Sequence, residues 1–202
     1  MLGVVTAESE ASAGSLAGSY PLEVVLCARD EALVRAWEVA ARQRPGIRVH
    51  QGSVLEVPVQ AVVSPANSYG WMRGGIDGYY AQAFPNIEQT VRSAVLAFHG
   101  GELPVGEALI VPTGASAPAW LISAPTMRNP GELLPNDTVH PYLAARGVFR
   151  LWRSGLLDEG VLIRQVVRSV ALPGLGTGVG GVAPETCARQ VIAAWDEVFL
   201  RK

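Results

Sequence analysis

Residues 62–78 read VVSPANSYGWMRGGIDG, and this stretch passes from an apolar run through a polar loop into a helical pattern. The apolar run predicts a buried strand that ends at Ser64, because Pro65 disfavours a helix at that point. Gly74 and Gly75 directly precede the predicted helix, where free amides and the positive helix end can face an anion. A strand, a loop and a helix in succession are typical of α/β domains.

Asn67 and Asp77 bracket this loop, and two interpretations of them stay open. Both have short polar side chains that suit the binding of hydroxyl groups. Alternatively, Asn67 only satisfies a turn, the two glycines only permit it, and Asp77 only favours a helix start.

Short apolar runs alternate with helical patterns along the rest of the chain. The predicted strands cover residues 23–27, 47–50, 61–64, 108–111, 120–124 and 166–172, and the predicted helices cover 31–42, 76–84, 86–98, 141–154 and 184–200. We predict an α/β domain, a three-layer α/β/α sandwich with a central mixed sheet, in which ligands bind at the carboxyl ends of strands. Residues 1–20 are predicted to be a flexible tail, and residues 21–202 one domain.

A second glycine-rich loop, LPGLGTGVGGVAP, covers residues 172–184. Its backbone amides can contact a diphosphate, and Thr177 adds a hydroxyl group. Gly176–Gly181 matches the GxGxxG fingerprint, but a dinucleotide-binding unit needs a further strand, and here the chain ends after one helix. A tight connection without a ligand is the alternative. The two loops together favour one diphosphate-containing nucleotide.

The composition excludes several chemistries. The formal charge of the 202 residues is −2, which disfavours a nucleic-acid-binding surface, so no nucleic acid partner is predicted. The only lysine is Lys202, which excludes a Walker A lysine and a Schiff-base cofactor. Cys27 and Cys187 are predicted to be buried free thiols, and His50, His99 and His140 are too scattered to predict a metal site. No cofactor, signal peptide or membrane span is predicted, and the expected compartment is the cytoplasm.

The two loops resemble those of the macro domain, a family that binds ADP-ribose. The family's Asn-Ala-Ala-Asn stretch, glycine run and Val-Asp-Gly resemble Ser64–Asn67 and Gly74–Gly78, with the same ten positions between the Asn and the Asp. Its Ser-Thr-Gly-Val-x-Gly loop is similar to Gly176–Gly181, and its Val-Ile-His strand is similar to Leu121–Pro125. The order of these motifs also resembles a bacterial and phage branch of tail-associated macro-like proteins.

The resemblance implies a site for ADP-ribose. Asn67 and Asp77 are the implied catalytic residues: Asn67 contacts the distal ribose, and Asp77 positions or activates a water near the anomeric carbon. The remaining implied ligand contacts are Ser53, Gly74, Gly75, Ile76, Pro125, Gly176, Thr177, Gly178, Val179 and Gly180. The implied partner is ADP-ribose or an ADP-ribosylated protein.

Three departures from the family pattern bear on function. Ser53 stands where many members use an Asp to bind adenine, Met72 and Arg73 replace half of the glycine run, and the second loop has one extra residue before Pro184. The resemblance therefore implies an ADP-ribose-binding domain that hydrolyses ADP-ribosyl esters or a related derivative. The alternative is a non-catalytic reader or a phage-related interaction module. Two interpretations of Arg73 stay open: it either reaches a phosphate or points to solvent. Tyr69 and Trp71 either cover a ligand or a partner, or are only loop residues. The oligomeric state also stays open.

Overall fold

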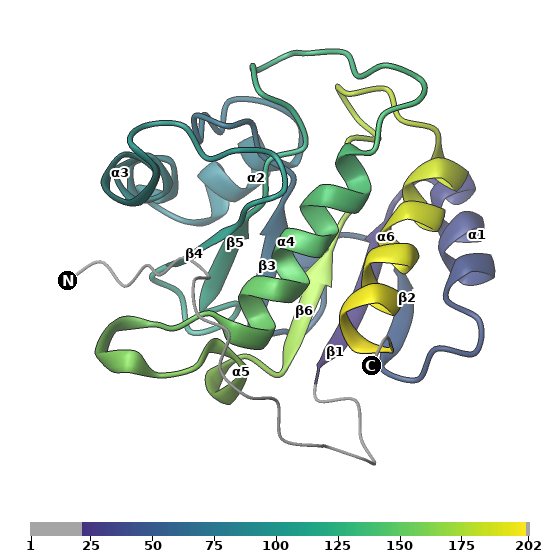
Figure 1. Ribbon diagram of the computed structural model, residues 1–202, viewed down its shortest axis with the longest axis horizontal. Helices are drawn as coiled ribbons and strands as arrows, with labels where there is room; N and C mark the ends of the chain where they lie inside the picture. Colours follow the sequence, from purple (N-terminus) through teal and green to yellow (C-terminus); the bar gives the residue numbers. More distant parts are fainter. Residues whose placement is uncertain (1–21, 201–202) are drawn as a thin grey trace.

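The computed structural model describes residues 22–200. The predicted tail, residues 1–20, and Lys202 lie outside this range. Six strands form one sheet: β1 (Glu23–Ala28), β2 (Ile47–Gln51), β3 (Ala61–Ser64), β4 (Leu109–Pro112), β5 (Trp120–Ser123) and β6 (Ser169–Leu172). Their order is β2-β1-β6-β3-β5-β4, and all neighbours are parallel except the β4–β5 pair, so the sheet is mixed as predicted (Figure 1).

Helices cover both faces of the sheet (Figure 1). The α-helices are α1 (Glu31–Ala40), α2 (Gly75–Ala83), α3 (Ile87–His99), α4 (His140–Ser154), α5 (Ile163–Val166) and α6 (Pro184–Phe199), and two short 3-10 helices are η1 (Val54–Glu56) and η2 (Asp158–Gly160). One core lies between the sheet and α1, α4, α5 and α6, and the other between the sheet and η1, α2 and α3. These layers confirm the predicted three-layer α/β/α sandwich.

The helix starts and the cores follow from local sequence. Asp30 caps α1 by accepting a 3.0 Å hydrogen bond from the amide of Leu33, which satisfies one of the free amides of the first turn. Trp37 of α1, Trp152 of α4 and Trp195 of α6 are buried in the first of these cores. Burial of such large side chains supplies much of the hydrophobic stabilisation of the fold.

One predicted strand begins too early. The apolar pattern predicts a strand over residues 166–172, but Val166 ends α5 and β6 begins at Ser169. The amide of Val167 donates to the carbonyl of Ile163, and the carbonyl of Val167 accepts the indole N–H of Trp152 at 2.7 Å. A buried indole N–H needs an acceptor, and the turn at residue 167 provides it.

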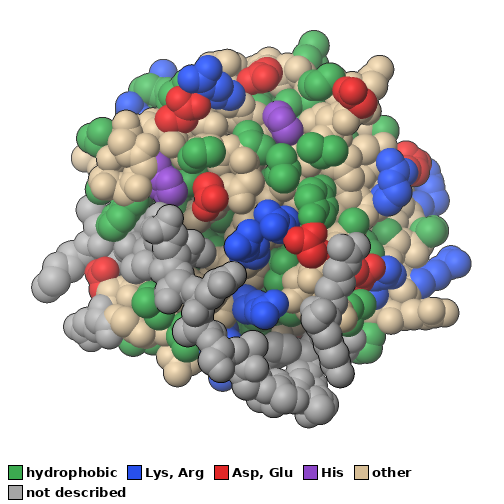
Figure 2. Space-filling view, viewed as in Figure 1, with side chains coloured by type: hydrophobic (Ala, Val, Ile, Leu, Met, Phe, Trp, Pro, Cys, Tyr) green, Lys and Arg blue, Asp and Glu red, His purple; other side chains and the backbone are tan. Residues whose placement is uncertain are grey.

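The surface carries charges of both signs. On the face shown in Figure 2, basic and acidic side chains lie interspersed among apolar and neutral ones. Several are paired, as in the bidentate contact between Arg44 and Asp196. Within residues 22–200, no helix is long and apolar enough to span a bilayer.

Because β1, β3, β5 and β6 are parallel, the loops that follow them meet at one edge of the sheet. In Figure 1 this is the upper edge, where the loop after β5 lies beside the loop after β6. A 3.0 Å hydrogen bond from the amide of Leu134 to the carbonyl of Gly180 joins these two loops.

Candidate functional site

A cavity of about 880 Å³ lies at this edge of the sheet, between the two glycine-rich loops. It brings together eleven of the predicted site residues: Ser53, Asn67, Gly74, Gly75, Ile76, Asp77, Gly176, Thr177, Gly178, Val179 and Gly180. Pro125 is buried and does not line the cavity, whereas the next two residues, Thr126 and Met127, do. The volume is in the range of small-molecule sites.

The first loop continues the pairing of β3 with β5 beyond the ends of these strands. The amide of Thr126 donates to the carbonyl of Ala66 at 2.9 Å, and Asn67 forms an isolated parallel bridge with Met127. The loop therefore leaves the sheet along a fixed path, which places Asn67 at the cavity wall.

The side chain of Asn67 organises the loop that follows it. Its Oδ1 accepts hydrogen bonds from the amides of Tyr69 (3.1 Å) and Trp71 (3.3 Å), and its Nδ2 donates to the carbonyl of Trp71 (2.7 Å). One Nδ2 hydrogen is left for a ligand. The turn-satisfying interpretation of Asn67 is thus confirmed as a structural role, and a catalytic role stays a prediction.

The N-terminus of α2 presents free amides to the cavity. Gly74 is the N-cap residue and makes no side-chain cap, and within residues 22–200 the amides of Gly75, Ile76 and Asp77 donate no hydrogen bond. Gly75 has a φ of +55°, which favours glycine, and no atom lies within 4 Å of a Cβ placed on Gly74 or Gly75. Such a backbone permits close approach of an anionic ligand.

Asp77 lies in the first turn of α2, with only 7% of its surface exposed. Its Oδ1 accepts a 2.6 Å hydrogen bond from Ser64 Oγ. Burial raises the pKa of Asp77 from 3.8 to about 6, although the bond from Ser64 acts in the opposite direction. The carboxyl is therefore largely ionised at neutral pH and basic enough to accept a proton.

Two further titratable groups that line the cavity are neutral. Tyr80 is buried and donates to the carbonyl of Val63 at 2.9 Å, and burial, Asp77 and Cys27 all raise its pKa well above 10. Burial also raises the pKa of Cys27 to about 12. Both therefore keep their protons near neutral pH, and Cys27 is a buried free thiol as predicted, as is Cys187.

The second loop, residues 173–182, also presents amides to the cavity. In the part of the chain from Leu22 to Leu200, the amides of residues 176–180 donate no hydrogen bond. A Cβ on Gly180 would lie 2.7 Å from the carbonyl oxygen of Gly176, whereas a Cβ on Gly178 would meet no atom within 4 Å. Gly180 is therefore required by packing, and Gly178 faces open space.

Ser53 lines the cavity but already has a structural role. Its hydroxyl accepts the amide of Leu55, and its own amide donates to Glu56 Oε2 at 2.9 Å, which makes a capping box at η1. The hydroxyl hydrogen is left for a ligand.

Trp71 lines the cavity and carries two arginine side chains on its ring. The guanidinium carbons of Arg92 and Arg73 lie 3.4 and 4.2 Å from the ring centroid. Arg73 is otherwise 3.9 Å from Glu88, a weak contact for a largely exposed side chain. Arg73 thus stacks on Trp71 while its side chain stays largely exposed, which agrees with the expectation that it points to solvent. Its contact with a phosphate stays a prediction.

Several cavity residues were not among the predicted site residues. Arg29, Leu55, Tyr79 and Tyr80 line the cavity, and the loop after β5 adds Pro130 and Gly131. Arg29 lies two positions after the end of the first predicted strand. This position was the available signal, since ligands bind at the carboxyl ends of parallel strands.

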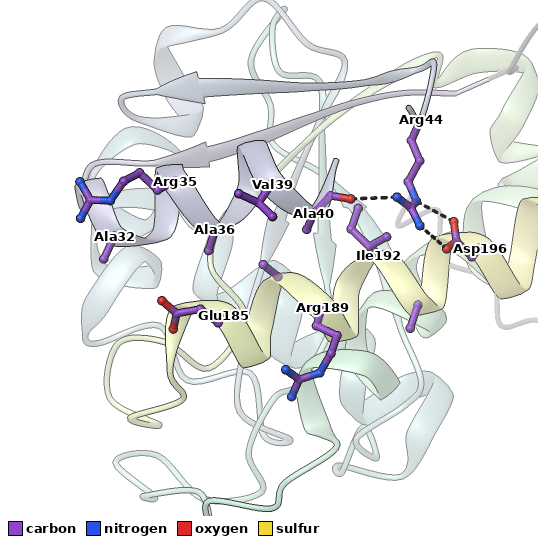
Figure 3. A pocket seen from close by; sticks show the side chains of 12 residues that line it. Ala32, Arg35, Ala36, Val39, Ala40, Arg44, Glu185, Arg189, Ile192 and Asp196 are labelled. Atoms are coloured by element: carbon purple, nitrogen blue, oxygen red, sulfur yellow. Dashed lines mark hydrogen bonds and ion pairs between the residues drawn. The ribbon is translucent and has the colours of Figure 1, made fainter. Parts of the chain in front are cut away.

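A second cavity, of about 670 Å³, lies between α1 and α6 (Figure 3). Its walls include alanines of both helices, and the pair between Arg44 and Asp196 lies at one end. It contains neither glycine-rich loop, so the cavity at the sheet edge is the better candidate site. Within residues 22–200, no group of three or more His, Cys, Asp or Glu is arranged to hold a metal ion.

The family model described as the macro domain matches residues 63–191 of this chain. An uncharacterized protein of Aeropyrum pernix is 32% identical over 163 residues, which are 80% of this chain and 75% of that protein. A DNA ADP-ribosyl glycohydrolase of Thermus aquaticus is 30% identical over 138 residues, and the match covers 67% of this chain but only 34% of that protein.

Solved structures show the same fold. The macrodomain of Mycobacterium tuberculosis DarG has a TM-score of 0.59 at 23% identity, covering 73% of this chain and 88% of that chain. The macrodomain of Thermus aquaticus DarG has a TM-score of 0.57 at 25% identity, covering 73% and 89%. With its family match and its fold, this chain belongs to the macro domain family.

Proposed function

We propose that this chain binds ADP-ribose in the cavity at the sheet edge and hydrolyses the bond between ADP-ribose and a carrier. ADP-ribose has a diphosphate between two sugars, and unpaired amides line the cavity on two sides, at the start of α2 and in residues 176–180. The assignment of the predicted ligand contacts, including Pro125, is part of this proposal.

The observation that supports the hydrolytic step is the buried carboxylate of Asp77, which lines the cavity and has a raised pKa. A water in the cavity gives a proton to the carboxylate while its oxygen bonds to the anomeric carbon of the distal ribose. The bond from that carbon to the carrier breaks, and the carrier leaves with the electron pair and takes up a proton. Asn67 acts mainly by holding the loop beside this carbon, since most of its hydrogen bonds go to the backbone.

The test is calorimetry of the full chain with ADP-ribose, with ADP and AMP as controls at two salt concentrations, followed by a release assay on ADP-ribosylated carriers. Asp77→Asn keeps the shape of the site, so we expect binding to persist and release to fall by about 100-fold or more. Asp158→Asn, at the exposed η2, is the matched control. Equal release by the wild type and Asp77→Asn would contradict the mechanism.

A non-catalytic reader is the second candidate. It is favoured by the use of Ser53 in a capping box and of Arg73 in a stack, since both positions depart from the family pattern. Binding of ADP-ribose without release from any carrier would support the reader and contradict the hydrolase.

DNA is the carrier suggested by the names of relatives, although the match covers only about a third of the Thermus aquaticus glycohydrolase. The formal charge of −2 predicts no nucleic acid partner. The cluster of Arg73 and Arg92 on Trp71 favours a nucleic acid carrier instead, since arginines contact phosphates and aromatic rings stack on bases. Release from a single-stranded DNA carrier, compared with a glutamate-linked peptide, decides between these carriers.

The cytoplasmic location and the resemblance to the phage tail-associated branch remain proposals. Two buried free thiols are compatible with a reducing compartment. Cell fractionation with detection of the chain tests the location.

A further inference from the structure

Ser64 is the last residue of β3, and its side chain lies on the face of the sheet that α2 covers, next to Asp77. Both side chains are buried. The 2.6 Å bond from Ser64 Oγ to Asp77 Oδ1 is the only hydrogen bond to this carboxylate from residues 22–200. It is therefore the contact that sets the rotation of the carboxylate plane.

The second carboxylate oxygen, Oδ2, has no hydrogen-bond partner within residues 22–200, and it is not one of the fully buried polar atoms without a partner. It is thus accessible from the cavity that Asp77 lines. Because a carboxylate is planar, fixing Oδ1 against Ser64 also fixes the direction in which Oδ2 faces the cavity.

We infer that Ser64 is a positioning residue, whose hydroxyl holds one oxygen of Asp77 so that the other is directed at the reacting water. This inference rests on the proposed hydrolysis. Ser64 does not itself contact the substrate, and its effect passes through Asp77.

No other ionisable group that lines the cavity holds the Asp77 carboxylate in place. Cys27 of β1 and Tyr80 of α2 stay protonated near neutral pH. The charged side chains that line the cavity are Arg29, Asp30 and Arg73, and none of them makes a hydrogen bond or ion pair with Asp77. Burial and Ser64 are the two causes that set the pKa of Asp77.

Ser123 supplies a matched control. It is the register partner of Ser64 on the neighbouring strand β5, it is equally buried, and its hydroxyl has no hydrogen-bond partner within residues 22–200. Ser123→Ala therefore removes the same group from the same region without removing a contact of Asp77.

The experiment compares wild type, Ser64→Ala, Ser64→Thr and Ser123→Ala. The pH dependence of kcat/KM for ADP-ribosyl release is measured for each, and the Asp77 carboxyl is titrated by ¹³C NMR in the ligand-free protein, with Asp77→Asn identifying its signal. In Ser64→Ala we expect both midpoints to move to higher pH by about one pH unit, the equivalent of one charge-assisted hydrogen bond. Ser64→Thr should restore the wild-type midpoints, and Ser123→Ala should retain them.

Coincident titration midpoints for Ser64→Ala and Ser123→Ala, in variants that bind ADP-ribose and unfold cooperatively, would overturn the positioning role. If the wild type releases no ADP-ribose, the proposed hydrolysis fails, and the NMR titration still decides whether Ser64 controls Asp77. A moved NMR midpoint supports that control, and an unmoved one overturns it.

Discussion

Asp77→Asn is expected to stabilise the protein at neutral pH, because the wild-type carboxyl ionises in a buried place. The folded protein raises the pKa of Asp77 from 3.8 to about 6. A change in pKa of this size corresponds to roughly 3 kcal/mol of free energy. The asparagine side chain of the variant would still offer an oxygen to Ser64, so the packing of the pair is retained.

The direction of this change in stability follows from the protons that the folded and unfolded chains bind. The folded carboxyl holds its proton at higher pH than the unfolded chain does, so the group favours folding least where both forms are ionised. The cost develops as pH rises from about 4 to about 6 and is complete above about pH 7. Relative to the wild type, the free energy of unfolding of the variant should therefore rise by about 3 kcal/mol between about pH 3 and pH 8.

Thermal and denaturant unfolding of both proteins across this range, at constant ionic strength, measures the difference. For a chain of this size, about 3 kcal/mol is roughly 6–12 °C in Tm. All other titrating groups are shared, so they cancel in the comparison. Stability curves that stay parallel from acid to neutral pH would refute the argument that burial controls Asp77.

Three further predictions concern the loops and the thiols. Gly178→Ala should leave Tm unchanged yet weaken ADP-ribose binding, since its methyl group enters open space at the cavity that Gly178 lines, and a loss of Tm in this variant would be the contrary result. Gly180→Ala should lower the free energy of unfolding by about 1–3 kcal/mol, because its methyl group would clash with a backbone oxygen. Asn67→Ala should cost about 1–3 kcal/mol in unfolding free energy and increase proteolysis of the loop, because it leaves loop amides without their acceptor. Cys187 should react with a thiol reagent only as unfolding exposes it, and Cys27, which lines the cavity, should react slowly in the native protein, because burial raises the pKa of each to about 12; rapid labelling of the native protein would be the contrary result.

Most of the fold was predictable because local signals and tertiary structure agree. The five apolar runs of four or five residues became strands, and Asp30 and Pro184 lie where capping and first-turn preferences place them. The error at Val166 arose because a valine pair fits a strand pattern as well as it fits the end of a short helix, where Val166 is exposed and Val167 is buried.

The site was predictable as a set of loops but not as a set of contacts. The bond between Ser64 and Asp77 joins residues 13 positions apart, and it depends on how α2 packs against β3. The stack of Arg92 on Trp71 likewise depends on the placement of α3. The capping box at Ser53 did have a signal, since Ser53 is followed three residues later by Glu56.

The glycines of the second loop show why composition alone was not enough. Gly176, with a φ of +71°, and Gly180 are required by backbone conformation or packing, so their presence would be explained without any ligand. Gly178 has space for a side chain and a φ outside the left-handed region. Only a glycine with free space around it, such as Gly178, favours a ligand. The number of glycines in the sequence does not distinguish such a glycine from one that the backbone conformation or the packing requires.

The same distinction applies to Asp77. If residue 77 served only to accept the hydrogen bond from Ser64, an asparagine would do so without ionising in a buried place, and the roughly 3 kcal/mol cost would be absent. The cost falls on a side chain that lines the cavity, beside free amides and with one oxygen unpartnered within residues 22–200. Buried carboxyls with a raised pKa are found preferentially at functional sites. Packing and helix stability therefore account for Asp77 less well than a role as a base does.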